Sequence, residues 1–374
     1  MQKIFETNGD YSALDSWFTD NDVKSVLLVC GSSISRHKIN EYFKSLPDRL
    51  RVEVTYFSDF KPNPIYEDVV KGVKAFRERN CDTVIAVGGG SAMDVGKCIK
   101  LFATLSGDGA DGGWLNQEYR DNDIHFLAMP TTSGTGSEAT SFAVIYYNGS
   151  KCSIDHESTI PEAVLMDATV LKSVPVYHKK ATMLDALCHG VESMWSVNST
   201  EESREYAYQA IKMVADNMES YLANDDEGNA NMLKAANLAG RAINISKTTA
   251  GHAMCYKITG LFGCAHGHAA ALCDRVLYPW MVESADKCSD ARGADYLKGI
   301  LSKIGEALGC TDAESGARRF NEIFDGLQLE VPTADSVQFE ILKKSVNVDR
   351  LKNHPITLDE DEINNLYHMI LNGE

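Results

Sequence analysis

The stretch Thr83-Val-Ile-Ala-Val-Gly-Gly-Gly-Ser-Ala-Met-Asp-Val-Gly-Lys97 joins an apolar run to a glycine turn and then to a helical pattern. The run 83–87 is typical of a buried strand. After the turn, apolar residues recur at helical spacing, at Cys98, Leu101, Phe102 and Leu105. Strand, turn and helix in this order indicate an α/β fold. Glycines at a helix N-terminus let backbone N–H groups face an anion, so the turn is a candidate pyrophosphate site; an ordinary tight turn is the alternative.

Similar apolar runs on both sides of this stretch predict further strands. They cover residues 25–30, 52–57, 124–129, 142–147, 151–154 and 163–166. Residues 66–79 have helical periodicity, and Asn148-Gly149 predicts a hairpin closed by a type I′ turn. Strands alternating with helices predict one α/β domain over residues 1–177.

A second loop with small hydroxyl residues and glycines follows the predicted strand 124–129. It reads Pro130-Thr-Thr-Ser-Gly-Thr-Gly-Ser-Glu138. Open α/β sheets bind ligands at the carboxyl ends of their strands, which is where this loop begins. A Ser/Thr-rich loop with a helix cap is the alternative.

After about Pro175 the pattern becomes helical and stays so to the end of the chain. Ser199-Thr-Glu-Glu202 resembles a capping box before a helix with one apolar stripe. These patterns predict an all-helical domain over residues 178–374.

Two segments of this helical half hold candidate metal ligands. Asp185 and His189 are four residues apart, so on a helix both side chains leave the same face. His252 and His266 lie in a glycine-rich segment whose glycines are expected to form turns that aim both rings at one point; these are Gly251, Gly260, Gly263 and Gly267. Carboxylate and imidazole ligands suit Fe²⁺ or Zn²⁺. Solvation or helix capping is the alternative for the first pair.

Composition limits the partners of such a site. The chain has 36 basic and 53 acidic residues, a net charge of −17, which argues against nucleic acid or an anionic membrane as partner. No stretch approaches eighteen apolar residues, and the first residues lack the apolar core of a signal peptide. The ten scattered cysteines form no C-x-x-C motif. We expect a cytoplasmic protein with a small-molecule substrate.

With these motifs placed, the chain resembles the iron-containing, or group III metal-dependent, alcohol dehydrogenases over nearly its whole length. The glycine turn, the Pro130 loop, the Asp185/His189 pair and the His252/His266 pair carry the likeness. It implies a Rossmann-like dinucleotide-binding domain followed by a helical metal-binding domain. It further implies a homodimer and an enzyme that uses NAD(P)H and Fe²⁺, or Zn²⁺.

The resemblance also implies roles for individual residues. The metal ligands would be Asp185, His189, His252 and His266. Residues expected at the cofactor are Gly88, Gly89, Gly90, Ser91, Asp94, Lys97, Thr131, Thr132, Thr135, Lys151 and Leu171. Relatives that prefer NAD often place an Asp after the first strand of the domain, where it repels the 2′-phosphate of NADPH. In this chain Gly31 follows the predicted strand 25–30. We therefore expect NADPH to be tolerated.

Three residues near the ligands bear on the substrate: Tyr256, Lys257 and His268. In this part the chain resembles most the branch of phosphonoacetaldehyde and sulfoacetaldehyde reductases. Lys257 would then contact the anionic group, and Tyr256 or His268 would relay a proton; ordinary packing or solvent exposure is the alternative for each. The expected function is reduction of a short anionic aldehyde.

Other functions compatible with these motifs remain open. One is reduction of neutral short aldehydes, of the lactaldehyde, propanediol or glycerol type. Another is the chemistry of glycerol dehydrogenase or dehydroquinate synthase, in which three protein ligands often hold zinc. The last is a nucleotide- and metal-binding relative without turnover.

Overall fold

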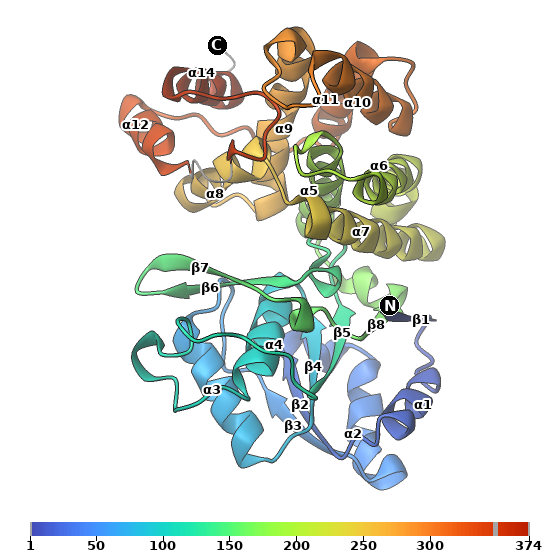
Figure 1. Cartoon of the computed structure of the whole chain (residues 1–374). Helices are drawn as coiled ribbons and strands as arrows, with labels where there is room; N and C mark the ends of the chain where they lie inside the picture. Colours follow the sequence, from blue (N-terminus) through green and yellow to red (C-terminus); the bar gives the residue numbers. More distant parts are fainter. Residues whose placement is uncertain (1, 347–350, 373–374) are drawn as a thin grey trace. The chain divides into compact units, whose positions relative to one another are not determined.

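The computed structural model describes residues 2–346 and 351–372, which form two compact units (Figure 1). The first unit holds the chain up to Thr132 together with Gly136–Ser173. The second holds Ser133–Thr135 and the chain from Val174 onward. An α/β unit and a helical unit confirm the predicted fold class.

The first unit is built on a six-stranded parallel sheet of order β1-β8-β5-β4-β2-β3. Its strands are β1 (Lys3–Thr7), β2 (Ser25–Cys30), β3 (Glu53–Phe57), β4 (Thr83–Gly88), β5 (His125–Pro130) and β8 (Ala163–Asp167). Its α-helices are α1 (Ala13–Asp20), α2 (Ile39–Leu50), α3 (Tyr66–Glu78) and α4 (Gly90–Phe102). The apolar residues of the interior strands β2 and β4 are almost fully buried, as expected for strands covered on both faces.

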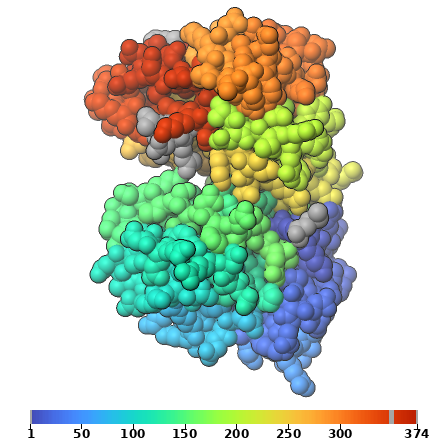
Figure 2. Space-filling model, in the orientation of Figure 1, coloured from blue at the N-terminus to red at the C-terminus, as the bar shows by residue number. Residues whose placement is uncertain are grey.

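A separate hairpin joins β6 (Phe142–Tyr147) to β7 (Ser150–Asp155). Asn148 and Gly149 between them both have positive φ, 49° and 73°, as a type I′ turn requires. The predicted hairpin is therefore confirmed. In Figure 2 the segments around this hairpin, coloured green and teal, lie on the visible surface of the first unit.

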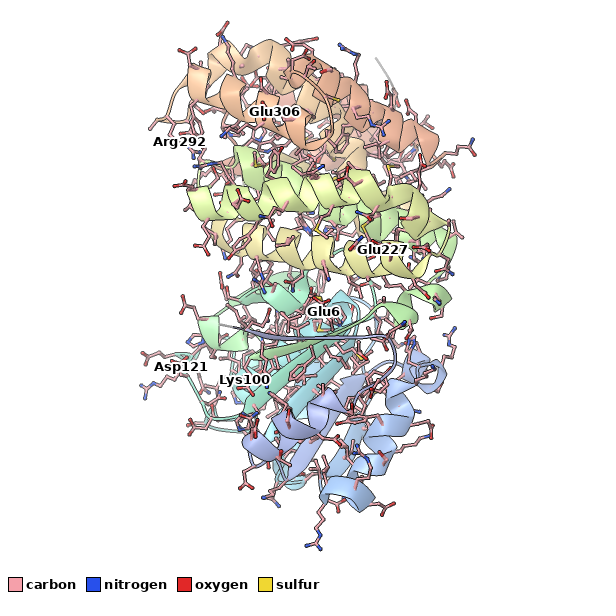
Figure 3. The ribbon with its side chains drawn as sticks, turned by 90° about the vertical axis from the view of Figure 1, so that its right-hand side faces the viewer. Glu6, Lys100, Asp121, Glu227, Arg292 and Glu306 are labelled. Carbon is pink, nitrogen blue, oxygen red and sulfur yellow. The ribbon has the colours of Figure 1, made fainter. Side chains whose placement is uncertain are left out.

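The second unit consists almost entirely of helices. They are α5 (Val176–Trp195), α6 (Glu201–Leu222), α7 (Asp226–Ser246), α8 (Ala250–Phe262), α9 (His266–Ser284), α10 (Ala294–Ala307), α11 (Ala313–Gly326), α12 (Ser336–Ser345) and α14 (Glu360–Leu371). Helix α5 packs against α6, α7 and α9, and α8 packs against α9. Arg292, before α10, donates hydrogen bonds to the carbonyl oxygens of Ser196 and Ser199 and so ties α10 to the α5–α6 connection (Figure 3).

Two local predictions differ from the structure. Strand β1 was not predicted, because it is short and holds only two apolar residues, Ile4 and Phe5. The N-cap of α6 is Thr200, whose side chain accepts from the Ser203 N–H while the Ser203 hydroxyl accepts from the Thr200 N–H, so the capping box begins one residue later than predicted. Among the described residues, no helix combines the length and the apolar character needed to cross a membrane.

Candidate functional site

Three helices of the second unit bring the predicted metal ligands together. Asp185 and His189 project from one face of α5, and both are buried. His252, also buried, lies in the first turn of α8, and His266 is the first residue of α9. Because α9 packs against both α5 and α8, residues about seventy positions apart become neighbours.

The distances place these side chains around one point. One ligand atom each from Asp185, His189 and His252 lies within 4.8 Å of the other two. His252 Nε2 is 3.5 Å and His266 Nε2 is 4.0 Å from Asp185 Oδ1. The rings of His189 and His252 stack with centroids 4.5 Å apart. His266 completes the group from the side, with 38% of its side chain exposed.

Unpartnered polar atoms show that this group fits a metal ion. Asp185 Oδ1, His189 Nδ1 and His252 Nε2 are buried and make no hydrogen bond among the described residues. Buried polar atoms are nearly always hydrogen-bonded. Three such atoms without a hydrogen bond in one cluster are explained if they bind a metal ion. One carboxylate and three imidazoles form a donor set that suits Fe²⁺ or Zn²⁺.

Burial and neighbouring charges shift the pKa values of the side chains in this cluster. Burial lowers the pKa of His189 to about 4, which keeps this imidazole neutral, the form that binds metals. Burial alone would raise the pKa of Asp185, but the neighbouring imidazoles outweigh it and hold that pKa well below its usual range. Burial also opposes a charged His252, yet the carboxylates of Glu192 and Asp185 raise its pKa to about 10.

Glu192 is a buried residue of this site that the sequence reasoning missed. It lies on the same face of α5 as Asp185 and His189, seven residues after the first and three after the second. Its carboxylate accepts hydrogen bonds from the backbone N–H and ring Nδ1 of His252 and from the N–H and hydroxyl of Thr249. The available signal was a charged residue on an otherwise apolar helix face, seven residues after a candidate ligand.

The glycines beside the ligands differ from the prediction. Gly251, Gly260 and Gly267 lie inside helices, and of the four only Gly263, with φ of 71°, forms a turn. A Cβ on Gly251 would lie 2.0 Å from Asp274 Oδ1, and one on Gly267 would lie 2.1 Å from the Ala181 carbonyl oxygen. These two glycines allow close helix packing and do not aim the histidines through turns.

The three predicted substrate residues lie in different environments. Tyr256, one turn after His252, stacks on His266 with ring centroids 5.4 Å apart. Lys257 is exposed on α8 and makes no ion pair within the described ranges. His268 is buried, with Nδ1 3.2 Å from the Tyr177 hydroxyl, and burial lowers its pKa.

Some of the predicted cofactor residues, Gly31 and the glycine turn, lie at the carboxyl edge of the parallel sheet. Strands β2 and β4 are adjacent, although β3 lies between them in sequence and pairs on the other side of β2. This reversal of strand order is a topological switch point, where open α/β sheets bind ligands. Gly31 follows β2, and Gly88–Gly89 connect β4 to α4. A Cβ on Gly88 would lie 2.6 Å from the Ala92 Cβ.

The Pro130 loop begins beside the glycine turn. Gly88 and Pro130 are register partners, and the Thr131 N–H donates to the Gly88 carbonyl oxygen at 2.9 Å. Thr132 belongs to the first unit and Thr135 to the second. Of the other predicted cofactor residues, Ser91 lies in the first turn of α4, Lys151 on β7, and Leu171 in a short 3₁₀ segment where it is fully buried.

Lys97 is fully buried on α4, and the partly buried Asp94 lies one turn before it. The Lys97 ammonium donates to the Thr140 hydroxyl and the Phe142 carbonyl oxygen, both at 2.8 Å, which ties α4 to the start of β6. Desolvation lowers the pKa of Lys97 and raises that of Asp94. The structure therefore gives Lys97 contacts within the first unit that do not depend on a cofactor.

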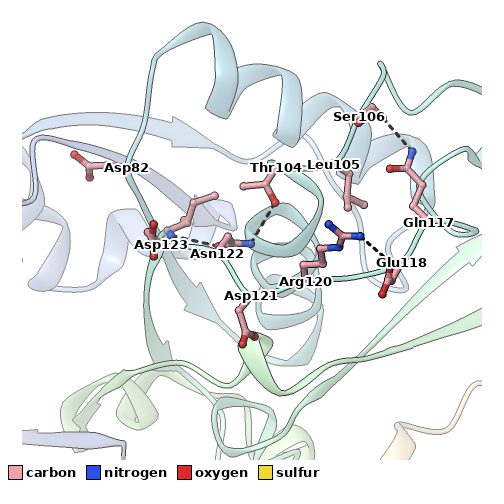
Figure 4. Close-up of a pocket in the computed structure, with 11 residues that line it drawn as sticks. Asp82, Thr104, Leu105, Ser106, Gln117, Glu118, Arg120, Asp121, Asn122 and Asp123 are labelled. Carbon is pink, nitrogen blue, oxygen red and sulfur yellow. Dashed lines mark hydrogen bonds and ion pairs between the residues drawn. The ribbon is translucent and has the colours of Figure 1, made fainter.

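A surface pocket of about 870 Å³ lies elsewhere in the first unit (Figure 4). It is lined by Asp82 and Asp123, just before β4 and β5, and by the loop between α4 and β5. Its polar groups largely pair with one another, as Arg120 does with Glu118. The pocket lies at the amino ends of the strands, away from the edge that holds Gly31 and Gly88.

Both halves of the chain match profiles of one protein family. Residues 2–168 match the family profile of iron-containing alcohol dehydrogenase, and residues 179–371 match the C-terminal profile of the Fe-containing alcohol dehydrogenase family. Long-chain-alcohol dehydrogenase 1 of Geobacillus thermodenitrificans is 31% identical over 271 residues, 69% of this chain and 67% of the relative. Phosphonoacetaldehyde reductase of Streptomyces viridochromogenes is 29% identical over 315 residues, 80% of this chain and 79% of the relative.

The fold is also similar to solved structures. The crystal structure of sulfoacetaldehyde reductase from Bifidobacterium kashiwanohense in complex with NAD⁺ has a TM-score of 0.87 and 23% identity, covering 100% of this chain and 98% of that chain. At this identity the likeness supports the fold alone.

Proposed function

The chain belongs to the iron-containing alcohol dehydrogenase family, and from this premise we propose that it reduces a short anionic aldehyde to the corresponding alcohol. The predicted family and enzyme class are thereby confirmed. In the proposed reaction the carbonyl carbon receives a hydride from NAD(P)H and the carbonyl oxygen receives a proton. The products are the alcohol and NAD(P)⁺.

The observation that carries this proposal is the convergence of three buried, unpartnered donor atoms on Asp185, His189 and His252. With His266 these residues would hold a divalent ion, and helices α5, α8 and α9 fix their positions. When bound, the ion supplies Lewis-acid polarisation of the carbonyl group, and the nicotinamide supplies the hydride. The chain itself contributes position and charge.

The glycines at the sheet edge support NAD(P)H as the cofactor. No carboxylate follows β2, where one would accept a hydrogen bond from the ribose 2′-hydroxyl and repel a 2′-phosphate. Gly31 has φ of −80° and ψ of 173°, an extended conformation that any residue adopts. A Cβ there would approach nothing closer than the Ser33 hydroxyl at 4.0 Å. The position can therefore accept a larger side chain.

Replacing Gly31 by Asp is expected to shift cofactor preference toward NADH. The new carboxylate would repel a 2′-phosphate and accept from a free 2′-hydroxyl, so we expect the NADH/NADPH ratio of kcat/KM to rise by at least about tenfold, which corresponds to about 1.4 kcal/mol. Ser35→Asp places the same charge on an exposed residue of the same loop and should change the ratio little. An unchanged ratio in Gly31→Asp would show that this loop does not face the ribose.

Lys257 and one of the relatives support an anionic substrate. Lys257 is an exposed cation five residues after His252, without an ion pair in the described part of a chain that has a net charge of −17. Phosphonoacetaldehyde reductase, 29% identical to this chain, acts on an aldehyde with an anionic group. An extended lysine side chain can reach several ångströms toward such a group.

The helix geometry favours a second candidate function, reduction of neutral aldehydes. Five residues place Lys257 roughly 140° around α8 from His252, at about 100° per residue. Tyr256 instead lies on the His252 side and stacks on His266. If Lys257 points to solvent, Tyr256 presents an aromatic ring near the candidate ligands, and such a ring does not select for an anionic group.

Replacing Lys257 by Met separates the two candidates. Met retains the apolar stem and removes the charge, so kcat/KM for sulfoacetaldehyde or phosphonoacetaldehyde should fall by roughly 10- to 150-fold, the equivalent of about 1.5–3 kcal/mol for a hydrogen bond to a charged group. Activity on propionaldehyde should stay about the same. Lys303→Met, at an exposed lysine of α10, is the matched control and should alter neither activity. Equal losses on charged and neutral aldehydes would count against the anionic substrate.

One experiment tests the function as a whole. The protein is purified without chelator, its metal content is measured, and NAD(P)H oxidation is followed with two-carbon aldehydes that carry hydrogen, hydroxyl, sulfonate or phosphonate. Highest kcat/KM with the anionic members supports the proposal. Turnover only with neutral members favours the second candidate, and no turnover by the metal-loaded protein would indicate a binding protein that has lost catalysis.

A further inference from the structure

Glu192 lies directly behind the candidate metal site and touches one of its ligands. Its side chain is fully buried. One oxygen, Oε1, accepts from the His252 backbone N–H at 3.0 Å and from the His252 ring Nδ1. The ring is thus held at the nitrogen opposite the one that is 3.5 Å from Asp185.

The other carboxylate oxygen is held as firmly. Oε2 accepts from the Thr249 hydroxyl at 2.7 Å and from the Thr249 backbone N–H. The Thr249 hydroxyl in turn accepts from Trp195 Nε1 at 2.8 Å. Among the described residues, the hydrogen-bond partners of the Glu192 carboxylate are therefore all donors, and they come from Thr249 and His252 at the start of α8. An ionised carboxylate has two oxygens that only accept hydrogen bonds, so both oxygens suit these donors.

This arrangement determines which nitrogen of His252 faces the other ligands. While Nδ1 donates to Glu192, the lone pair available for a metal is on Nε2, and Nε2 has no hydrogen-bond partner among the described residues. Carboxylates that accept from metal-binding histidines in this way fix both ring orientation and tautomer. The same carboxylate also fixes the start of α8, the helix that carries His252.

We propose that Glu192 is a positioning residue that orients His252 and so sets the affinity of the site for a divalent ion. The inference rests on the proposed metal site but not on the identity of the substrate. Glu192 itself is not placed to touch the ion or the reacting atoms. Its effect is transmitted through the His252 ring.

The substitution Glu192→Gln tests this role with little change in shape. Wherever the amide group turns, its NH₂ meets a donor, either the Thr249 N–H and hydroxyl or the His252 N–H and Nδ1–H. If it turns toward His252, Nδ1 must accept, the proton moves to Nε2, and the metal-binding lone pair is lost. We expect affinity for Co²⁺, measured by competition with a coloured chelator, to fall by about 10- to 100-fold.

Ser193→Ala is the matched control on the neighbouring residue. Ser193 is also buried on α5, and its hydroxyl accepts a hydrogen bond at 2.8 Å from Ser246, which is not a candidate ligand. Both variants lose a buried hydrogen bond and are expected to lower the melting temperature of the metal-free protein. Only Glu192→Gln should weaken Co²⁺ binding and change the visible absorption of the bound Co²⁺, since only this variant alters the His252 ring.

Glu192→Asp keeps an acceptor-only carboxylate on a shorter side chain, so its loss of Co²⁺ affinity should be smaller than that of Glu192→Gln. This ordering also tests the inference if Glu192→Gln does not fold, because Glu192→Asp should then still bind more weakly than Ser193→Ala. Wild-type affinity and an unchanged Co²⁺ spectrum in the Glu192 variants would overturn the positioning role while leaving the proposed function intact. Failure of the wild-type protein to bind Co²⁺ would overturn the metal site and this inference together.

Discussion

Replacing His266 by Ala is expected to abolish most turnover and to release the metal. His266 Nε2 lies 4.0 Å from Asp185 Oδ1 and adds a fourth donor to the buried cluster of Asp185, His189 and His252. Loss of the ion removes several kcal/mol of transition-state stabilisation, so kcat should fall on the order of a thousandfold or more. Metal content after dialysis and steady-state rates with an aldehyde measure both effects.

Dinucleotide binding should survive this substitution. The glycine turn at Gly88–Gly89 belongs to the first unit, whereas His266 begins α9 of the second. NADH titration followed by fluorescence should therefore give a Kd close to that of the wild-type protein. His178→Ala is a suitable control, because His178 is an exposed histidine of α5 and is not part of the cluster. Undiminished activity and full metal content in His266→Ala would remove this residue from the site.

Much of the α/β unit could be predicted because its signals are local. A parallel strand covered on both faces is a continuous apolar run, and the predicted runs match β2, β4 and β8 within one residue at either end. Asn148-Gly149 specifies its turn through backbone conformation alone. Strand β1 could not be found in this way, because it pairs with β8 about 160 residues later and its two adjacent apolar residues are too few to form a pattern.

The clustering of the candidate metal ligands could be predicted from the sequence, but the residue that supports them could not. Asp185 and His189 are four residues apart, a spacing visible in any helix, and imidazoles are conspicuous in sequence. Glu192 depends on donors 57 and 60 residues away, at Thr249 and His252, so its role appears only when α5 and α8 are placed together. The residue type alone does not show that this glutamate is buried.

The prediction that the glycines near the histidines form turns was wrong for a different reason. It relied on a local signal, and tertiary packing overrides that signal. Glycine usually weakens a helix, so a glycine-rich segment predicts turns. Gly251 and Gly267 instead lie where neighbouring atoms leave no room for a Cβ. A larger residue would favour the helix more than glycine does, but at these two positions it would clash with the neighbouring helix.

Replacing Gly267 by Ala should therefore separate α9 from α5. An added Cβ would lie 2.1 Å from the Ala181 carbonyl oxygen and 2.5 Å from the Asp185 Cβ, and the first of these atoms is backbone and cannot rotate away. Overpacking of this kind usually costs about 1–3 kcal/mol, and fixed backbone places this case at the upper end. For a helical unit of about 200 residues, a loss of about 3 kcal/mol lowers Tm by roughly 6–12 °C. Because His266 precedes Gly267, the same shift should also reduce metal content.

Gly260→Ala provides the matched control for this prediction. Gly260 also lies inside a helix, α8, but a Cβ there would have no atom within 4 Å. Alanine should then raise stability by up to about 1 kcal/mol through its higher helix propensity and the smaller entropy of the unfolded chain. The two Gly→Ala changes are chemically identical and are expected to shift Tm in opposite directions, measured by thermal unfolding of the metal-free proteins. If Gly267→Ala melted as Gly260→Ala does, the close approach of α9 to Asp185 would be wrong, and with it the position of His266 in the metal site.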